Sequence, residues 1–208
     1  MTADDICGVV VAGGRSTRFG DREKALADVA GQPMLQRVVT TLGAVTQEVV
    51  VNCRPDQRVA FDAALDGADT DVRFALDDET DEGPLAGLRT GLAAVETEFA
   101  VVLGCDMPLA EAPTLRALTE RVRPGDDAVV PTTTGGPEPL HAVYRVDSTV
   151  KAAEDTLSDG QLSLRAVLDR LDVRTVPVGD GPVPERSVTS VDTPAELERV
   201  EAIRRGTE

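Results

Sequence analysis

The feature that most constrains this chain is the alternation of short apolar runs with amphipathic helical patterns. The first apolar run, Ile6–Val11, passes directly into Ala12-Gly13-Gly14, as is typical of a buried strand that ends in a turn. Further strands are predicted at residues 48–52, 72–76, 99–103, 128–131, 140–145 and 173–178. Strands that alternate with helices build a mostly parallel sheet. We therefore expect an α/β fold of three layers, with a Rossmann-like sheet covered by helices on both faces.

The helical patterns fall between these strands and after the last of them. They cover residues 33–42, 56–65, 85–95, 113–122, 147–157, 163–171 and 194–204. The final helix has a clear start signal, because Thr193-Pro194-Ala195-Glu196 combines a capping box with proline at the first helical position. Residues 179–186, rich in Gly, Asp and Pro, are expected to form a loop, as are residues 132–137. No internal repeat or low-complexity linker divides the chain, which predicts a single domain over residues 1–208.

The charge balance excludes a large class of partners. The 37 acidic and 21 basic side chains give a net charge of −16, whereas a nucleic-acid-binding domain needs a basic face. Aromatic residues make up only 2% of the chain, too few for base-stacking platforms. No apolar run approaches the roughly 18 residues of a membrane span, and no signal peptide opens the chain. Three widely spaced cysteines are expected to be reduced core thiols, so the chemistry favours a cytoplasmic protein.

The composition also favours adaptation to high salt. Carboxylates are abundant, Lys24 and Lys151 are the only lysines, and the core must be built mainly from small aliphatic residues. Carboxylates stay hydrated where salt screens their mutual repulsion. The alternative is an ordinary acidic cytoplasmic protein.

The loop after the first strand is the best candidate for a binding site, because ligands of open parallel sheets bind beyond the carboxyl ends of the strands. Arg15, Arg18, Arg22 and Lys24 fall within ten residues on an otherwise acidic chain. Glycines allow backbone N–H groups to approach an anion, and clustered basic side chains add charge-assisted hydrogen bonds. The pattern indicates a phosphate-rich ligand, although neither the Walker A nor the dinucleotide-binding glycine pattern is present. A strand-end turn with solvated arginines is the alternative.

Three further residues have side chains that could bind a metal or take part in a reaction. Asp106 follows an apolar strand, where a carboxylate facing a phosphate loop is typical of a magnesium ligand, but a helix cap or turn residue is as common there. His141 is the only histidine and lacks a G-x-S-x-G partner motif, so we expect a histidine near the site rather than a catalytic base. Cys105 is interpreted as a core residue, because the neighbouring carboxylate disfavours its thiolate.

Short motifs follow one another along nearly the whole chain. They are Ala12-Gly13-Gly14 continuing to Lys24-Ala25-Leu26, Gly83-Pro84-Leu85-Ala86-Gly87, Cys105-Asp106-Met107-Pro108, Glu138-Pro139-Leu140 with Tyr144-Arg145, and Asp192-Thr193-Pro194. Together they resemble the molybdenum cofactor guanylyltransferases, whose fold is that of the nucleotide-diphospho-sugar transferases. The first motif is shared by many nucleotidyltransferases, whereas the second and third narrow the resemblance to molybdopterin nucleotidyltransferases. Ala-Gly-Gly favours the guanylyl over the cytidylyl branch.

The resemblance implies a role for each matching position. The loop after the first strand and the carboxyl ends of the next strands would bind GTP, through Ala12, Gly13, Gly14, Arg15, Lys24, Asn52, Asp77 and Asp106. Arg18 and Lys24 would contact the phosphates and act with Asp106 in catalysis, while Asn52 and Asp77 would recognise guanine. Asp78 is the alternative to Asp77 as the residue that recognises guanine. Magnesium would be the cofactor, held by Asp106 and Asp192.

Two positions depart from the family's usual pattern. Asp-Arg-Glu separates Gly20 from Lys24, where the family usually has one or two residues, so the register of Lys24 is open. Asp192 stands in Ser-Val-Asp-Thr-Pro, where the family commonly has Asn-x-Asn-Thr-Pro. Its role as a second metal ligand therefore competes with simple support of the helix start.

The resemblance implies an enzyme that transfers GMP from GTP to molybdopterin or the molybdenum cofactor and releases pyrophosphate. The acceptor phosphate is already an anion and needs no general base, which suits a chain with one histidine. Molybdoenzymes or cofactor-assembly proteins are the expected protein partners. The alternatives are cytidylyl transfer to the same cofactor, guanylyl transfer to another phosphorylated acceptor, or a non-catalytic nucleotide-binding module.

Overall fold

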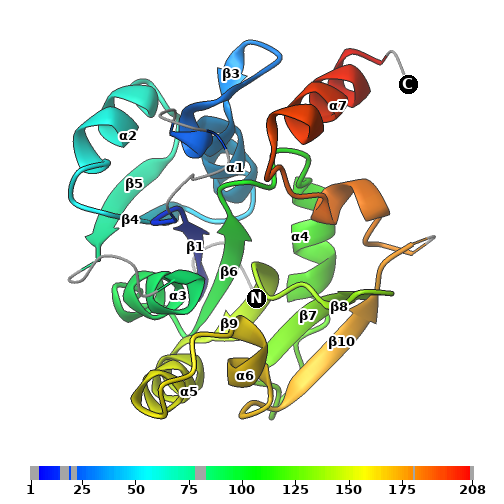
Figure 1. The fold of residues 1–208 in the computed structure, drawn as a ribbon. Helices are drawn as coiled ribbons and strands as arrows, with labels where there is room; N and C mark the ends of the chain where they lie inside the picture. The colour runs from blue at the N-terminus through cyan, green and yellow to red at the C-terminus, as the bar shows by residue number, and fades with distance from the viewer. Residues whose placement is uncertain (1–4, 15–18, 20–22, 78–82, 180, 207–208) are drawn as a thin grey trace.

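A twisted mixed sheet runs through the middle of the computed structural model (Figure 1), which describes residues 5–14, 19, 23–77, 83–179 and 181–206. The strands are β1 (Ile6–Val11), β2 (Asp28–Val29), β3 (Gln32–Pro33), β4 (Glu48–Cys53), β5 (Asp71–Leu76), β6 (Phe99–Gly104), β7 (Ala128–Thr133), β8 (Gly136–Pro137), β9 (His141–Arg145) and β10 (Val173–Pro177). The α-helices are α1 (Met34–Gly43), α2 (Arg58–Ala64), α3 (Gly83–Ala93), α4 (Ala112–Thr119), α5 (Val146–Ser158), α6 (Leu164–Leu168) and α7 (Pro194–Arg205). Two short 3₁₀ helices, η3 (Lys24–Leu26) and η4 (Glu185–Val188), complete the described elements.

The strand order of the main sheet is β10-β7-β9-β6-β1-β4-β5, with β8 added beside β7. The pairs β6–β1, β1–β4, β4–β5 and β10–β7 are parallel, whereas β9 runs antiparallel to both of its neighbours. Val11 pairs with Asn52 on one side and with Gly104 on the other. The carboxyl ends of β1, β4 and β6 therefore meet at one edge, as the expected α/β fold requires.

Helices cover both faces of the sheet, which confirms the expected three layers. Apolar side chains of α1, α2 and α4 pack on one face, and those of α3, α5 and α6 pack on the other. Every residue of β1 and of β6 is buried, which explains why these strands are apolar throughout instead of alternating. Within the described residues, no helix combines the length and the apolar character needed to cross a membrane.

The three cysteines lie in this core. Cys7, Cys53 and Cys105 are buried and unpaired by disulfides, as expected. Burial, with a smaller contribution from Glu48, raises the pKa of Cys7 to about 11, and burial raises that of Cys53 to about 12. These thiols therefore stay protonated and pack as small apolar residues.

The connection from η3 to α1 differs from the sequence prediction. β2 and β3 form a small hairpin whose turn residues, Ala30 and Gly31, have φ values of 50° and 85°, a backbone that suits a two-residue hairpin turn. Pro33 pairs with Asp28 in this hairpin and precedes the helix as its N-cap, so α1 begins one residue later than predicted. The expected loop at residues 132–137 was also wrong in part, because β7 extends to Thr133 and pairs there with β8.

The C-terminal helix α7 packs against the hairpin and begins as the sequence predicts. The Thr193 side chain accepts a hydrogen bond from the N–H of Glu196 (3.3 Å), and the Glu196 carboxylate accepts one from the hydroxyl of Thr193 (3.0 Å). The same carboxylate also accepts from the N–H of Asp192 (2.8 Å), one residue earlier than in the usual capping box. Val191, Leu197 and Val200 then join a small apolar cluster with the hairpin, Met34 and Leu109.

His141 is fully buried in β9, and neither ring nitrogen has a hydrogen-bond partner in the described part of the chain. Burial lowers its pKa to about 4, against about 6.5 when the chain is unfolded. The unfolded state therefore binds the proton first, so this contribution to stability is complete above pH 6.5 and is lost as the pH falls toward 4. We expect wild type to lose about 3 kcal/mol more unfolding free energy than His141→Leu between pH 7 and 4.

Urea unfolding of both proteins at several pH values measures this difference. Because all the carboxylates are common to the two chains, their titration cancels in the comparison. Parallel stability curves for wild type and His141→Leu would contradict the prediction.

Candidate active site

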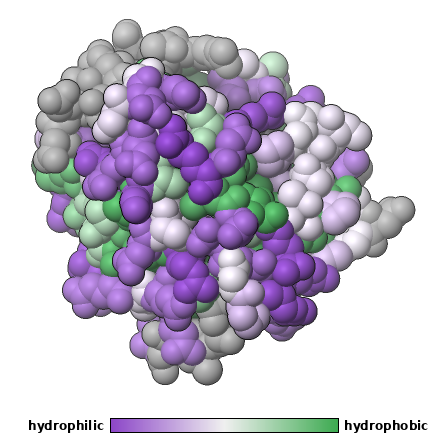
Figure 2. Space-filling model, turned by 90° about the horizontal axis from the view of Figure 1, so that it is seen from below, coloured by the Kyte–Doolittle hydropathy of each residue, from purple (hydrophilic) through white to green (hydrophobic). Residues whose placement is uncertain are grey.

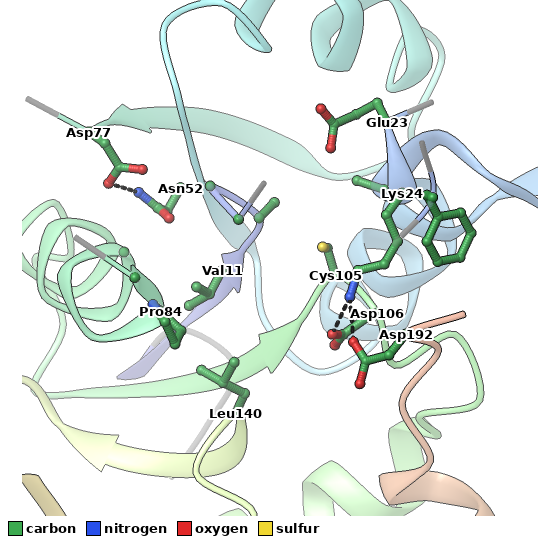
Figure 3. Close-up of a pocket in the computed structure, with 17 residues that line it drawn as sticks. Val11, Glu23, Lys24, Asn52, Asp77, Pro84, Cys105, Asp106, Leu140 and Asp192 are labelled. Atoms are coloured by element: carbon green, nitrogen blue, oxygen red, sulfur yellow. Dashed lines mark hydrogen bonds and ion pairs between the residues drawn. The ribbon is translucent and has the colours of Figure 1, made fainter. Parts of the chain in front are cut away.

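A pocket of about 390 Å³ opens at the edge where the carboxyl ends of β1, β4 and β6 meet (Figure 3). Loops after these strands, the start of α3 and the segment before α7 build its wall. The lining residues are Val11, Ala12, Gly13, Gly14, Phe19, Glu23, Lys24, Ala25, Asn52, Asp77, Gly83, Pro84, Gly87, Cys105, Asp106, Leu140 and Asp192. The polar side chains gather at two separate ends of this pocket.

At one end of the pocket the side chains of Asn52 and Asp77 are hydrogen-bonded to each other. The Asn52 amide donates a hydrogen bond from Nδ2 to Oδ1 of Asp77 (2.7 Å) and approaches the carbonyl of Ala75 (3.4 Å). Asn52 is completely buried, so it fixes the orientation of the more accessible Asp77 carboxylate. Burial raises the pKa of Asp77, and the hydrogen bond from Asn52 opposes that rise. This end therefore offers a carboxylate held as a hydrogen-bond acceptor.

Two glycines make this close packing possible. A Cβ added to Gly87 would lie 2.5 Å from Oδ1 of Asn52, and one added to Gly13 would lie 2.3 Å from Oδ2 of Asp77. Both distances are shorter than a van der Waals contact. The glycines of the first two motifs thus allow the backbone of the β1 loop and of α3 to approach the Asn52–Asp77 pair.

At the other end Lys24 bridges two carboxylates. Its Nζ donates to Oδ2 of Asp106 (2.8 Å) and to Oδ1 of Asp192 (3.0 Å). Burial alone would lower the pKa of the Lys24 ammonium, but the charge of Asp106 and the hydrogen bonds to both carboxylates outweigh it and raise the pKa. Lys24 is therefore a permanent cation between two carboxylates. The spacing from Gly20 left the position of Lys24 open, and the structure places this lysine in the pocket.

The backbone holds both carboxylates in place. Asp106 follows β6, and a Cβ added to Gly104 would lie 2.5 Å from its Oδ1, so this position also requires glycine. The Asp106 carbonyl accepts a hydrogen bond from the N–H of Val191 (2.8 Å), which ties the segment before α7 to the end of β6. Asp192 is then fixed by the Glu196 carboxylate described above. Asp192 thus lies at the site as well as at a helix start.

The structure brings together most of the residues that the sequence singled out. Eight of them line the pocket: Ala12, Gly13, Gly14, Lys24, Asn52, Asp77, Asp106 and Asp192. Arg15, Arg18, Arg22 and Asp78 lie outside the described residues. Their predicted roles, like the metal and nucleotide roles of the other residues, stay predictions. His141 is buried in β9, and burial raises the pKa of the Cys105 thiol, so neither side chain offers a base or nucleophile at this pocket.

Sequence reasoning missed two side chains that contact the β1 loop from behind. Arg54 donates to the carbonyls of Gly13 and Gly14, and Gln57 donates to the carbonyl of Ala12. Both belong to the turn between β4 and α2. The available signal was the position of Arg54 directly after a strand whose end faces the site.

The family model described as the MobA-like NTP transferase domain matches residues 8–175. The chain belongs to this family. The match covers both ends of the pocket except for Asp192, which lies beyond it.

Individual relatives match most of the chain. A probable molybdenum cofactor guanylyltransferase of Natronomonas pharaonis is 44% identical over 196 residues, which are 92% of this chain and 95% of the relative. One of Haloferax mediterranei is 41% identical over 169 residues, which are 81% of this chain and 79% of the relative. The crystal structure of molybdopterin-guanine dinucleotide biosynthesis protein A from Archaeoglobus fulgidus superposes with a TM-score of 0.76 at 25% identity, and the match covers 97% of this chain and 99% of that one.

Proposed function

We propose that this MobA-like protein transfers GMP from GTP to the terminal phosphate of molybdopterin or of its molybdenum-loaded form. An oxygen of the acceptor phosphate attacks the α-phosphorus of GTP. The bond between the α- and β-phosphates breaks, and pyrophosphate leaves with the electron pair. The observation that carries the proposal is the pocket with two different ends. Asp77 offers a hydrogen-bond-accepting carboxylate at one end, and Lys24 lies between Asp106 and Asp192 at the other.

The Asn52–Asp77 end suits guanine. The N1–H and 2-amino groups of guanine form a paired donor edge, which a carboxylate accepts and which cytosine and uracil lack. Asn52 and Thr90 both form side-chain hydrogen bonds to Asp77, so the remaining lone pairs of the carboxylate are oriented before a base arrives. Asp77 would thus select the nucleotide, with Asn52 as its support.

The Lys24 end suits the phosphates. Lys24 would exchange its present carboxylate partners for oxygens of the α-phosphate or of the leaving pyrophosphate, where negative charge accumulates during the transfer. The pocket walls would hold the two anionic substrates in line, which supplies most of the catalysis when the nucleophile is already ionised. No general base is required.

The same cluster also fits magnesium. Within the described ranges, no group of three or more His, Cys, Asp and Glu side chains could hold a metal ion. Asp106 and Asp192 both contact Nζ of Lys24, so the two carboxylates lie close enough together to supply two ligands to one ion. Magnesium is commonly bound in this way, by one or two carboxylates together with substrate phosphates and water. When bound, the ion would neutralise charge on the phosphates.

Pyrophosphate release tests the assignment. The protein is incubated with magnesium, molybdopterin and each of the four nucleoside triphosphates in turn. We expect pyrophosphate to be released when the triphosphate is GTP and not when it is one of the other three. Release only with CTP would favour cytidylyl transfer. Release with GTP only when another phosphorylated acceptor replaces molybdopterin would change the acceptor. The absence of release in every combination would favour a nucleotide-binding module.

We also propose that the protein works in a salt-rich cytoplasm. The net charge is −16, hydrophilic side chains cover much of the face seen in Figure 2, and the two relatives above come from halophilic archaea. Salt screens repulsion between surface carboxylates, so we expect the free energy of unfolding to rise between dilute buffer and molar KCl. Circular dichroism melts across this range measure the effect. A melting temperature that does not change, or falls, with added KCl would contradict it.

A further inference from the structure

Three successive backbone carbonyls of the loop after β1 accept hydrogen bonds from side chains of one short turn, the turn between β4 and α2. The carbonyl of Ala12 accepts from Nε2 of Gln57 (3.3 Å). Those of Gly13 and Gly14 both accept from Nη1 of Arg54 (3.0 and 2.8 Å). Gln57 is buried, and the Arg54 side chain is only 11% exposed, so the two side chains form a built support behind the loop.

This support determines which backbone groups face the ligand. In a trans peptide the C=O and the following N–H point in opposite directions. Because the carbonyls of Ala12 and Gly13 point toward Arg54 and Gln57, the N–H groups of Gly13 and Gly14 point away from them. In the part of the chain that the structure describes, no group accepts a hydrogen bond from either N–H. Gly13 and Gly14 line the pocket, whereas Arg54 and Gln57 do not.

Arg54 also reaches the far end of the same loop segment. Its Nη2 lies 3.4 Å from a carboxylate oxygen of Glu23, the residue before Lys24, and Nε lies 3.1 Å from Oδ1 of Asp56. One guanidinium therefore contacts the two residues that follow Ala12 and the residue that precedes Lys24. The bridge depends on a planar group with several fixed donors, which lysine cannot reproduce.

We propose that Arg54, supported by Gln57, is a positioning residue for nucleotide binding. Arg54 holds the carbonyls of Gly13 and Gly14 away from the pocket and so presents N–H groups to the anionic nucleotide. Gly13 adjoins Asp77, so these N–H groups would donate to the part of the nucleotide that lies beside the Asn52–Asp77 end, where inward carbonyls could only accept. The role rests on the proposed function only for the identity of the ligand, because the orientation of the peptides belongs to the free protein.

Calorimetric GTP binding to Arg54→Ala, Arg54→Lys and Arg58→Ala tests the proposal. Arg58 lies on the adjacent helix α2, pairs with Asp62 and contacts Phe74, so its loss removes the same charge without touching the loop. We expect the Kd for GTP to rise about tenfold in Arg54→Ala, which corresponds to about 1.4 kcal/mol. Arg54→Lys should recover part of this loss, and Arg58→Ala should stay within about twofold of wild type.

A kinetic split separates positioning from a merely structural role. Arg54→Ala should raise KM for GTP and leave kcat within about threefold, measured well below its melting temperature. A lower melting temperature with unchanged Kd and KM for GTP would overturn the proposal, because Arg54 would then only stabilise the fold.

Amide NMR of the nucleotide-free protein decides the inference even if GTP is not the ligand. The ¹H–¹⁵N signals of Gly13 and Gly14 should shift in Arg54→Ala and stay in place in Arg58→Ala. If wild type fails to bind GTP, the proposed function is wrong. The Gly13 and Gly14 signals still test whether Arg54 orients the loop. Glycine signals that are unchanged in Arg54→Ala would overturn it.

Discussion

Asp106→Ala is expected to lower kcat by about 1,000-fold while leaving the fold intact. The Asp106 carboxylate forms the shorter of the two bonds to Lys24 and is the central candidate for holding magnesium. Its side chain is about one-fifth exposed, and it lies in a loop after β6, so truncation leaves no cavity in the core. Steady-state pyrophosphate release measures the loss, and circular dichroism checks the fold.

Asp62→Ala is the matched control for this change. It removes the same charge from an exposed residue of α2 whose partner is Arg58, outside the pocket. We expect its kcat to stay within about twofold of wild type. An Asp106→Ala protein that turns over at a rate near wild type would remove Asp106 from the catalytic machinery and, with it, the proposed metal role.

Asp77→Asn is expected to lower kcat/KM for GTP by about 100-fold. In the proposed complex Asp77 accepts on two sides, from the Asn52 amide as in the free protein and from the donor edge of guanine. An asparagine carries one oxygen and one NH₂ group, so a donor would face a donor on one side or the other. Both the lost acceptor and the unpaired donor weaken the bound state.

CTP provides the internal control for Asp77→Asn. Cytosine lacks the paired donor edge, so the low activity with CTP should change little and the preference for GTP over CTP should shrink. Thermal melting of the variant checks that the loss of the Asn52 bond has not unfolded it. If GTP and CTP turnover fell by the same factor, Asp77 would support the pocket without reading the base.

The strand and helix pattern could be predicted from sequence because burial on two faces leaves little choice of residue. β1 and β6 are apolar throughout, β4 has an apolar centre, and α1 and α3 carry a regular apolar stripe, so their existence followed from the hydrophobic pattern alone. The meeting of the Gly13 loop with Asn52 and Asp106 also followed, since the carboxyl ends of parallel strands share one edge.

The remaining features depend on contacts between distant segments, which no local pattern encodes. Lys24 reaches Asp106 and Asp192 across 82 and 168 residues of sequence, and only the fold could settle its register. The position of Arg54 directly after β4 could place it near the site, but its role as a backbone support has no sequence signature, because its partners are carbonyls that every residue possesses. The β2–β3 hairpin escaped prediction because two-residue strands are too short for a periodic pattern.

The most direct measurement of the central claim follows the α-phosphate of GTP. GTP labelled at the α-phosphate is incubated with the protein, magnesium and molybdopterin, and the products are separated. The proposed transfer predicts that the label appears in a guanine dinucleotide of molybdopterin, with one unlabelled pyrophosphate released for each labelled product. Label that stays in GTP or appears as free GMP, with none in the dinucleotide, would contradict it.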